Sequence, residues 1–289
     1  MDIVTILENA ILSPDPSKRA EAEAQLNDAA TNHFSDYLQL LIGVLASNDA
    51  KTEVRMLASI ALKNQLTLKD QRTREAQHAR WLLLEPQVKN PIKEAALNAL
   101  LSPDSRVAGS AAQLVAAVAD IELPREQWPE LIPIIIENTK TENPVNVKRA
   151  SLLTIGYICE AADPQNPAII KQSNGILIAI VQGVQASEPL TLVRLTALNA
   201  LVNSLEFIRY NFDREGERNY IMQVVCEATQ ADDNELQASA FGWLARIMFI
   251  YYRYMALYME KGCYGLTVSG DRKSIRINSS HITSLQAVF

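Results

Sequence analysis

Apolar residues recur every three or four positions along nearly the whole chain, the period of an α-helix that buries one face. One phrase keeps returning: an apolar residue, a basic residue, two or three further residues, a small residue and then a run of aliphatics. It reads "EVRMLASIALKNQL" at 53–66, "NVKRASLLTIGYI" at 146–158 and "LVRLTALNALVNSL" at 192–205, with a fainter copy, "ELQASAFGWLARI", at 235–247. The pattern predicts helices, and its return predicts an internal repeat.

The spacing of the phrase identifies the kind of repeat. Apolar positions at i, i+4 and i+8 form one stripe on a helix, and the middle residue is small each time, as a close helix crossing requires. The stripes are Val54, Ala58 and Leu62; Val107, Ala111 and Val115; Val147, Ser151 and Ile155; Val193, Ala197 and Leu201; and Leu236, Ala240 and Leu244. Their first positions are separated by 53, 40, 46 and 43 residues. These steps match the two-helix HEAT repeat of about 40–47 residues, with an insertion in the first interval.

A partner helix is predicted before each stripe, and the turns between partners are polar. The partners are 33–46, 87–101, 125–139, 167–185 and 213–230, and the turns are "SND" at 47–49, "SPDS" at 102–105, "TENP" at 141–144, "SEP" at 187–189 and "ADDN" at 231–234. Ser, Asp and Asn in these turns can cap the following helix. "MDIVTILENAIL" and "RAEAEAQLNDAA" supply a more polar N-terminal pair, which suits a terminal cap. The predicted fold is all-α, an α-solenoid (a superhelix) of about six HEAT-type repeats.

Composition and charge reduce the number of functional classes to which the protein could belong. The formal net charge of −6 argues against a nucleic-acid partner and fits basic protein partners better. The three cysteines lie far apart in apolar helical patterns, which predicts reduced core thiols. The N-terminus lacks the basic region of a signal peptide, and no apolar run reaches the ~18 residues of a membrane span. These features predict a soluble intracellular protein without a membrane span.

The residues offer no constellation for catalysis, metal binding or a cofactor. His33, His78 and His281 are scattered, and the glycines do not cluster as a phosphate cradle. A HEAT-like DNA glycosylase is the best enzymatic alternative, but it needs a basic concave face that the acidic charge balance disfavours. We therefore predict a protein that is not an enzyme and has no cofactor.

Five stretches, taken in order, resemble the N-terminal part of the importin-beta (karyopherin-beta) family. They are "ALKNQLTLKD" at 61–70, "EQWPELIP" at 126–133, "IGYICE" at 155–160, "NALVNSLEFIRYNFD" at 199–213 and "YIMQVVCEATQ" at 220–230. The resemblance covers residues 1–270, which we interpret as a HEAT-repeat solenoid with an importin-beta N-terminal domain at roughly 21–101. It implies a nuclear transport receptor that shuttles between cytoplasm and nucleus through the nuclear pore.

The resemblance also implies two partners. Lys63, Asn64 and Lys69, joined by Asp163, would face the GTPase Ran in its GTP form; cations near a helix C-terminus can equally serve only to complement the helix dipole. FG-repeat nucleoporins would place phenylalanines in a shallow apolar groove between two neighbouring first helices. That groove would be formed by Leu177, Ile178, Val181, Glu217, Tyr220 and Ile221. For these six the alternative is plain packing between repeats.

The end of the chain departs from the family. After "YMEKGCYGLTVSG" the family continues with another repeat helix, whereas residues 271–289 read "DRKSIRINSSHITSLQAVF" and carry no sustained apolar stripe. We expect a disordered tail on a truncated array, without the groove for the importin-alpha adaptor that carries cargo. The alternative from a different class is a generic HEAT scaffold, such as a phosphatase scaffold subunit, with no role in transport.

Overall fold

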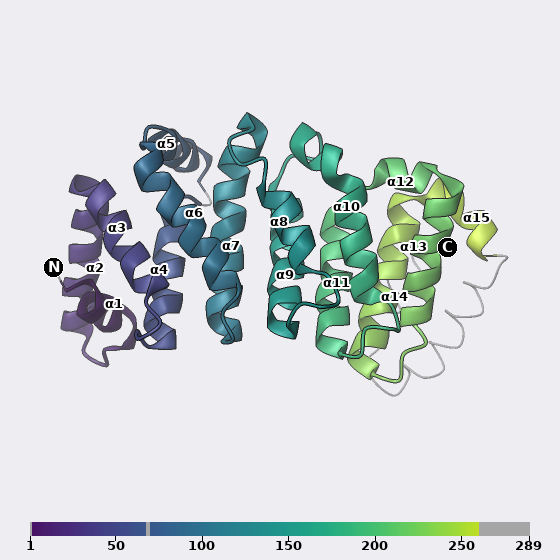
Figure 1. Cartoon of the computed structure of the whole chain (residues 1–289), viewed down its shortest axis with the longest axis horizontal. Helices are drawn as coiled ribbons and strands as arrows, with labels where there is room; N and C mark the ends of the chain where they lie inside the picture. Colours follow the sequence, from purple (N-terminus) through teal and green to yellow (C-terminus); the bar gives the residue numbers. More distant parts are fainter. Residues whose placement is uncertain (1, 68–69, 260–289) are drawn as a thin grey trace. The chain divides into compact units, whose positions relative to one another are not determined.

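In a computed structural model, residues 2–67 and 70–259 are described, and their regular structure is helical throughout, without strands (Figure 1). The chain divides into two compact units, Met1–Leu131 and Ile132–Phe289. The prediction of an all-α protein is confirmed. The predicted tail at 271–289 lies outside the described residues.

The first unit consists of three helix pairs and an extra helix. Its elements are α1 (Ile3–Leu12), α2 (Pro16–Asn32), α3 (Phe34–Ala46), α4 (Thr52–Asn64), α5 (Gln71–Leu82), α6 (Pro86–Leu100), α7 (Ser105–Glu122) and the short 3-10 helix η1 (Leu123–Arg125). The pairs are α1 with α2, α3 with α4 and α6 with α7, and successive pairs stack through α3 on α6 and α4 on α7. The extra helix is α5, which accounts for the insertion predicted in the first repeat interval.

The second unit continues the same pattern. Its elements are α8 (Leu131–Asn138), α9 (Val145–Ala161), α10 (Pro167–Val184), α11 (Thr191–Ser204), α12 (Arg209–Asp213), α13 (Glu215–Ala228), α14 (Asn234–Ile250), η2 (Tyr252–Tyr254) and α15 (Met255–Tyr258). The second helices α9, α11 and α14 pack in sequence, while the first helices α10 and α13 contact each other. With α8 and α9 as one repeat, the described residues hold the six predicted repeats.

The predicted stripes form the core of these stacks. Every one of their residues is buried, with at most 6% of its surface exposed. Small residues allow the helices to approach closely: a Cβ atom added at Gly183 of α10 would lie 2.8 Å from the Cβ atom of Ala197 on α11. The helical period and the small middle residue were therefore read correctly as packing signals.

Two details of the sequence-based prediction were wrong. The helix predicted at 125–139 begins only at Leu131, because Glu126 adopts a left-handed conformation with φ of 55° between two prolines, Pro124 and Pro129. Side-chain capping occurs at two of the five turns, where Asp104 and Asp233 accept hydrogen bonds from the backbone of α7 and α14. The residues at the N-caps of α4, α9 and α11 are Lys51, Pro144 and Leu190, which make no such bond.

The segment Ser105–Arg125 is long and apolar enough to cross a membrane by length and composition alone. However, 78% of its most apolar window is buried inside the protein. It includes α7, the central core helix of the first unit, so its apolar character is explained by packing against α4 and α6.

A buried ionic network connects three elements of the first unit. Glu122, at the end of α7, is 1% exposed. One of its carboxylate oxygens accepts a hydrogen bond from the Trp81 indole at 3.1 Å, and the other accepts one from the Lys93 ammonium at 3.0 Å. Lys93 also lies over the ring of Trp128, 5.2 Å from its centroid. The network joins α5, α6 and α7 around two buried indoles.

Candidate binding site between α10 and α13

Two large apolar side chains remain exposed on α10 and α13, two helices that contact each other. The sequence starts α10 with Asn166, whose side chain caps the helix, followed by Pro167 at a position where its missing N–H costs nothing. Ile178 on α10 is 57% exposed and Tyr220 on α13 is 46% exposed. The structure thus leaves an apolar surface on two helices that contact each other.

The other apolar residues predicted for this groove are buried. Leu177, Val181 and Ile221 are each at most 7% exposed. They pack inside the second unit, so they can form at most the floor of a groove. Of the six predicted residues, only Ile178, Tyr220 and Glu217 present substantial surface to a partner.

Polar contacts fix both ends of this surface. At one end, the Asn211 amide donates to Asn174 at 2.7 Å and to Glu217 at 2.6 Å, while Arg214 donates to Glu217 at 2.8 Å. The hydrogen bond from Arg214 lowers the pKa of Glu217, with a further contribution from Asn211. At the other end, the Gln185 amide donates a hydrogen bond to the Tyr220 hydroxyl. The groove predicted from Leu177, Ile178, Val181, Glu217, Tyr220 and Ile221 remains the candidate site, and we name it the α10–α13 groove.

Gln185 and Asn211, which make the polar contacts at the two ends of this surface, were not predicted from the sequence. Both are uncharged polar residues at or near helix ends, where sequence alone gives no reason to connect them with an apolar surface. A signal that could have found Asn211 is its place within "NALVNSLEFIRYNFD", one of the stretches that carries the family resemblance.

The residues predicted to face Ran lie in different parts of the chain. Lys63 and Asn64 are the last two residues of α4 in the first unit, and the Asn64 carbonyl accepts a hydrogen bond from Gln77 on α5 at 3.1 Å. Asp163 lies in the second unit after α9, where its carboxylate accepts a hydrogen bond from the backbone of Gln165. Lys69 lies outside the described residues. Lys63 and Asn64 belong to the first unit and Asp163 to the second, so a shared surface facing Ran stays a prediction.

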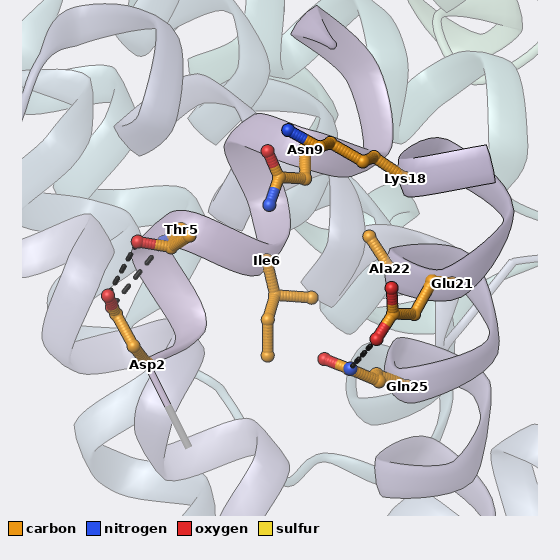
Figure 2. Close-up of a pocket in the computed structure, with 8 residues that line it drawn as sticks. All are labelled: Asp2, Thr5, Ile6, Asn9, Lys18, Glu21, Ala22 and Gln25. Carbon is orange, nitrogen blue, oxygen red and sulfur yellow. Dashed lines mark hydrogen bonds between the residues drawn. The ribbon is translucent and has the colours of Figure 1, made fainter. Parts of the chain in front are cut away.

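A surface cleft of about 590 Å³ lies between α1 and α2 (Figure 2). Its lining residues are Asp2, Thr5, Ile6, Asn9, Lys18, Glu21, Ala22 and Gln25. The hydrogen bonds drawn there stay within one helix, from Thr5 to Asp2 and from Gln25 to Glu21. Because these bonds do not cross the cleft, they do not hold its polar side chains toward a common ligand.

The titratable side chains elsewhere are explained by packing. His78 and Asp120 approach to 4.0 Å, too far for a hydrogen bond, and burial lowers the pKa of His78 and raises that of Asp120. Burial also raises the pKa of the Cys159 thiol to about 12, which agrees with its prediction as a core thiol. The described residues contain no group of three or more His, Cys, Asp or Glu side chains that could hold a metal ion.

Stacked helix pairs with these steps define the chain as a HEAT-repeat protein, whose chemistry lies in surfaces presented by successive helices. The profile of the "Importin-beta N-terminal domain" matches residues 22–102. Importin subunit beta-1 of Saccharomyces cerevisiae is 52% identical over 269 residues, which are 93% of this chain and 31% of the relative. Importin subunit beta-1 of Arabidopsis thaliana is 39% identical over 90% of this chain and 30% of the relative.

Solved structures agree with these relatives. The structure of yeast importin-beta (Kap95p) superposes with a TM-score of 0.89 and 49% identity, covering 99% of this chain and 33% of that one. The Kap95:Nup1 complex superposes with a TM-score of 0.87 and 49% identity, covering 98% of this chain and 33% of that one. Residues 22–102 match the importin-beta N-terminal domain, and the chain as a whole is similar to the corresponding part of importin-beta proteins. It spans about a third of the length of the relatives it matches.

Proposed function

We propose that the chain is a non-enzymatic nuclear transport receptor module that binds FG-repeat nucleoporins and Ran-GTP and moves between cytoplasm and nucleus. The observation that carries the proposal is the exposure of Ile178 and Tyr220 on α10 and α13, two helices that contact each other. The relative Kap95p forms a complex with Nup1, which supports a nucleoporin as the partner.

The energetics of such a groove suit passage through a pore. Burying one phenylalanine side chain contributes at most about 1.5–3 kcal/mol. That is weaker than the ~4.1 kcal/mol of a millimolar complex, so a single contact must be brief. Useful retention then comes from several linked motifs, which raise the effective concentration of each. Such a receptor stays associated with the FG repeats of the pore, while each single contact dissociates quickly enough for the receptor to move on.

Replacing Ile178 by aspartate should abolish retention of the chain on a column of immobilised FG repeats. The new carboxylate would stand where a phenyl ring has to be buried, at a desolvation cost comparable to the whole contact. Because Ile178 is exposed in the free chain, the helical circular dichroism spectrum should be unchanged.

The matched control for this variant is Leu192→Asp. Leu192 is 53% exposed and lies on α11, so it undergoes the same change of chemistry away from the groove. It should be retained like the wild type. Retention of Ile178→Asp equal to that of Leu192→Asp would contradict the nucleoporin-binding proposal and favour a scaffold without a transport role.

The Ran interaction is expected to depend on the bound nucleotide. Kap95p binding induces the switch loops of RanGDP to adopt the GTP-bound conformation. If this chain acts in the same way, binding to Ran-GDP includes the free-energy cost of that switch, whereas binding to Ran-GTP does not. A biosensor titration should therefore give tighter binding for Ran-GTP than for Ran-GDP; equal affinities would contradict the proposal.

Charge reversal tests the proposed contact surface within the same assay. Lys63→Glu should slow association with Ran-GTP, the usual effect of changing a charge at the rim of an interface. Lys171→Glu makes the same change on an exposed residue of α10 and should leave the association rate as it is in the wild type. Equal rates for both variants would remove Lys63 from the proposed surface.

A further inference from the structure

We propose that Gln185 is a positioning residue of the α10–α13 groove. Its hydrogen bond to the Tyr220 hydroxyl holds the phenol ring as a wall of the groove and keeps the exposed face of Ile178 available to an incoming aromatic side chain. This inference rests on the proposed function. It adds a residue that the apolar pattern of the groove does not include.

The exposure of the groove residues needs a restraint. Ile178 and Tyr220 lie on contacting helices, yet each leaves about half of its surface in water. The hydrophobic effect favours collapse of the ring onto Ile178, since contact between them would remove apolar area from water. The directional contact that opposes collapse is the hydrogen bond from the Gln185 amide to the ring's hydroxyl.

The register of α10 shows where that bond holds the ring. Gln185 is the residue that caps the C-terminus of α10 and follows Ile178 by seven residues, about two turns later. Two turns correspond to a rise of about 10 Å. The Tyr220 hydroxyl is therefore held toward the C-terminal end of α10, and the ring extends along the groove toward that end.

The backbone beneath the ring is fixed separately. Glu217, one turn before Tyr220, accepts hydrogen bonds from Asn211 and Arg214, and Asn211 also donates to Asn174 of α10. These contacts fix the first turn of α13 against α10. With that turn fixed, the Tyr220 side chain is the part of this wall that can move, and Gln185 determines its position.

The inference can be tested by a double-mutant cycle on the full chain. The variants are Tyr220→Phe, which removes only the hydroxyl, Gln185→Ala, and the two together. The probe is a synthetic peptide with several Phe-Gly motifs separated by Ser- and Asn-rich spacers, and the readouts are its affinity and dissociation rate. Each single variant should weaken binding about two- to tenfold, since one hydrogen bond then no longer favours the open position.

The double variant should be no weaker than the weaker-binding single variant, because both changes remove the same bond. Tyr210→Phe is the control: Tyr210 lies on α12, is 64% exposed and should bind the peptide like the wild type. Thermal unfolding midpoints should match the wild type in all variants, since both groups of the bond lie at the surface.

Three outcomes would overturn the inference: single variants that bind like the wild type, effects that multiply in the double variant, or a lowered unfolding midpoint that explains the loss. None of these outcomes bears on the proposed function, which is tested by Ile178→Asp. If Ile178→Asp abolishes retention while the Tyr220 and Gln185 variants bind the peptide like the wild type, the groove binds FG repeats and Gln185 has no part in it. If Ile178→Asp is retained, the groove itself is misassigned.

Discussion

Replacing Glu122 by alanine should destabilise the first unit by about 3–5 kcal/mol, the usual cost of breaking a buried ion pair by removing one partner. The variant leaves the Lys93 ammonium, whose side chain is 14% exposed, and the Trp81 indole N–H without their acceptors. The measurement is urea unfolding followed by tryptophan fluorescence, because Trp81 and Trp128 both lie in this unit. The urea concentration at the midpoint of the fluorescence transition should be much lower for Glu122→Ala than for the wild type.

Two further variants separate the charge from the packing. Glu122→Leu combined with Lys93→Met replaces the pair by apolar side chains of similar size and should recover much of the lost stability. Glu53→Ala removes a carboxylate from an exposed pair with Arg106 and should leave the midpoint essentially unchanged. If Glu122→Ala unfolds at the same urea concentration as Glu53→Ala, the network contributes nothing to the stability of the unit.

Replacing Val181 by aspartate should destabilise the second unit by about 3–5 kcal/mol, since it places an uncompensated charge in the core. Val181 is 2% exposed, whereas Ile178, three residues earlier on the same helix, accepts the same change at the surface. Thermal unfolding monitored by circular dichroism should therefore show a much lower midpoint for Val181→Asp than for Ile178→Asp. Similar midpoints would mean that Val181 is accessible and belongs to the open part of the groove.

The pH dependence gives a second check on Val181→Asp. Burial disfavours a charged carboxylate, so the folded variant binds a proton more tightly than the unfolded chain does. The loss of stability is then complete at neutral pH and diminishes as the pH falls through the raised folded-state pKa. The difference between Val181→Asp and the wild type should be smaller at pH 5 than at pH 7.

The contrast between these two residues shows what sequence could and could not predict. The repeats were predictable because each stripe has a helical period and a small residue where helices cross, and every stripe residue is buried. Ile178 and Val181 belong to one aliphatic run, "GILIAIVQGV", in which the neighbouring helix decides which side chain is covered. Exposure in such a run is a tertiary property, so sequence could propose these residues as a group but could not separate the buried ones from the exposed ones.

The apolar periodicity of the sequence could not predict two other features of the structure. The helix α5 carries little apolar periodicity, so the extra length of the first interval was visible but not its structure. The bond between Gln185 and Tyr220 joins residues 35 positions apart. Their proximity follows from the stacking of α10 on α13, which local propensity does not determine.

The position of α5 outside the stacked helix pairs affects which changes of sequence and length the first unit can tolerate. Its contacts with the unit include the hydrogen bond from Gln77 to the Asn64 carbonyl, the stacking of Arg80 over the ring of Phe34 at 3.6 Å and the bond from Trp81 to Glu122. The stacking of α3 on α6 and of α4 on α7 does not pass through it. Because neighbouring repeats depend on their shared interfaces, changes in α5 that keep its contacts with the unit should not alter the spacing of the stack. In this unit, new surface can therefore be acquired beside the array while the core remains as it is, provided that Arg80 and Trp81 are kept.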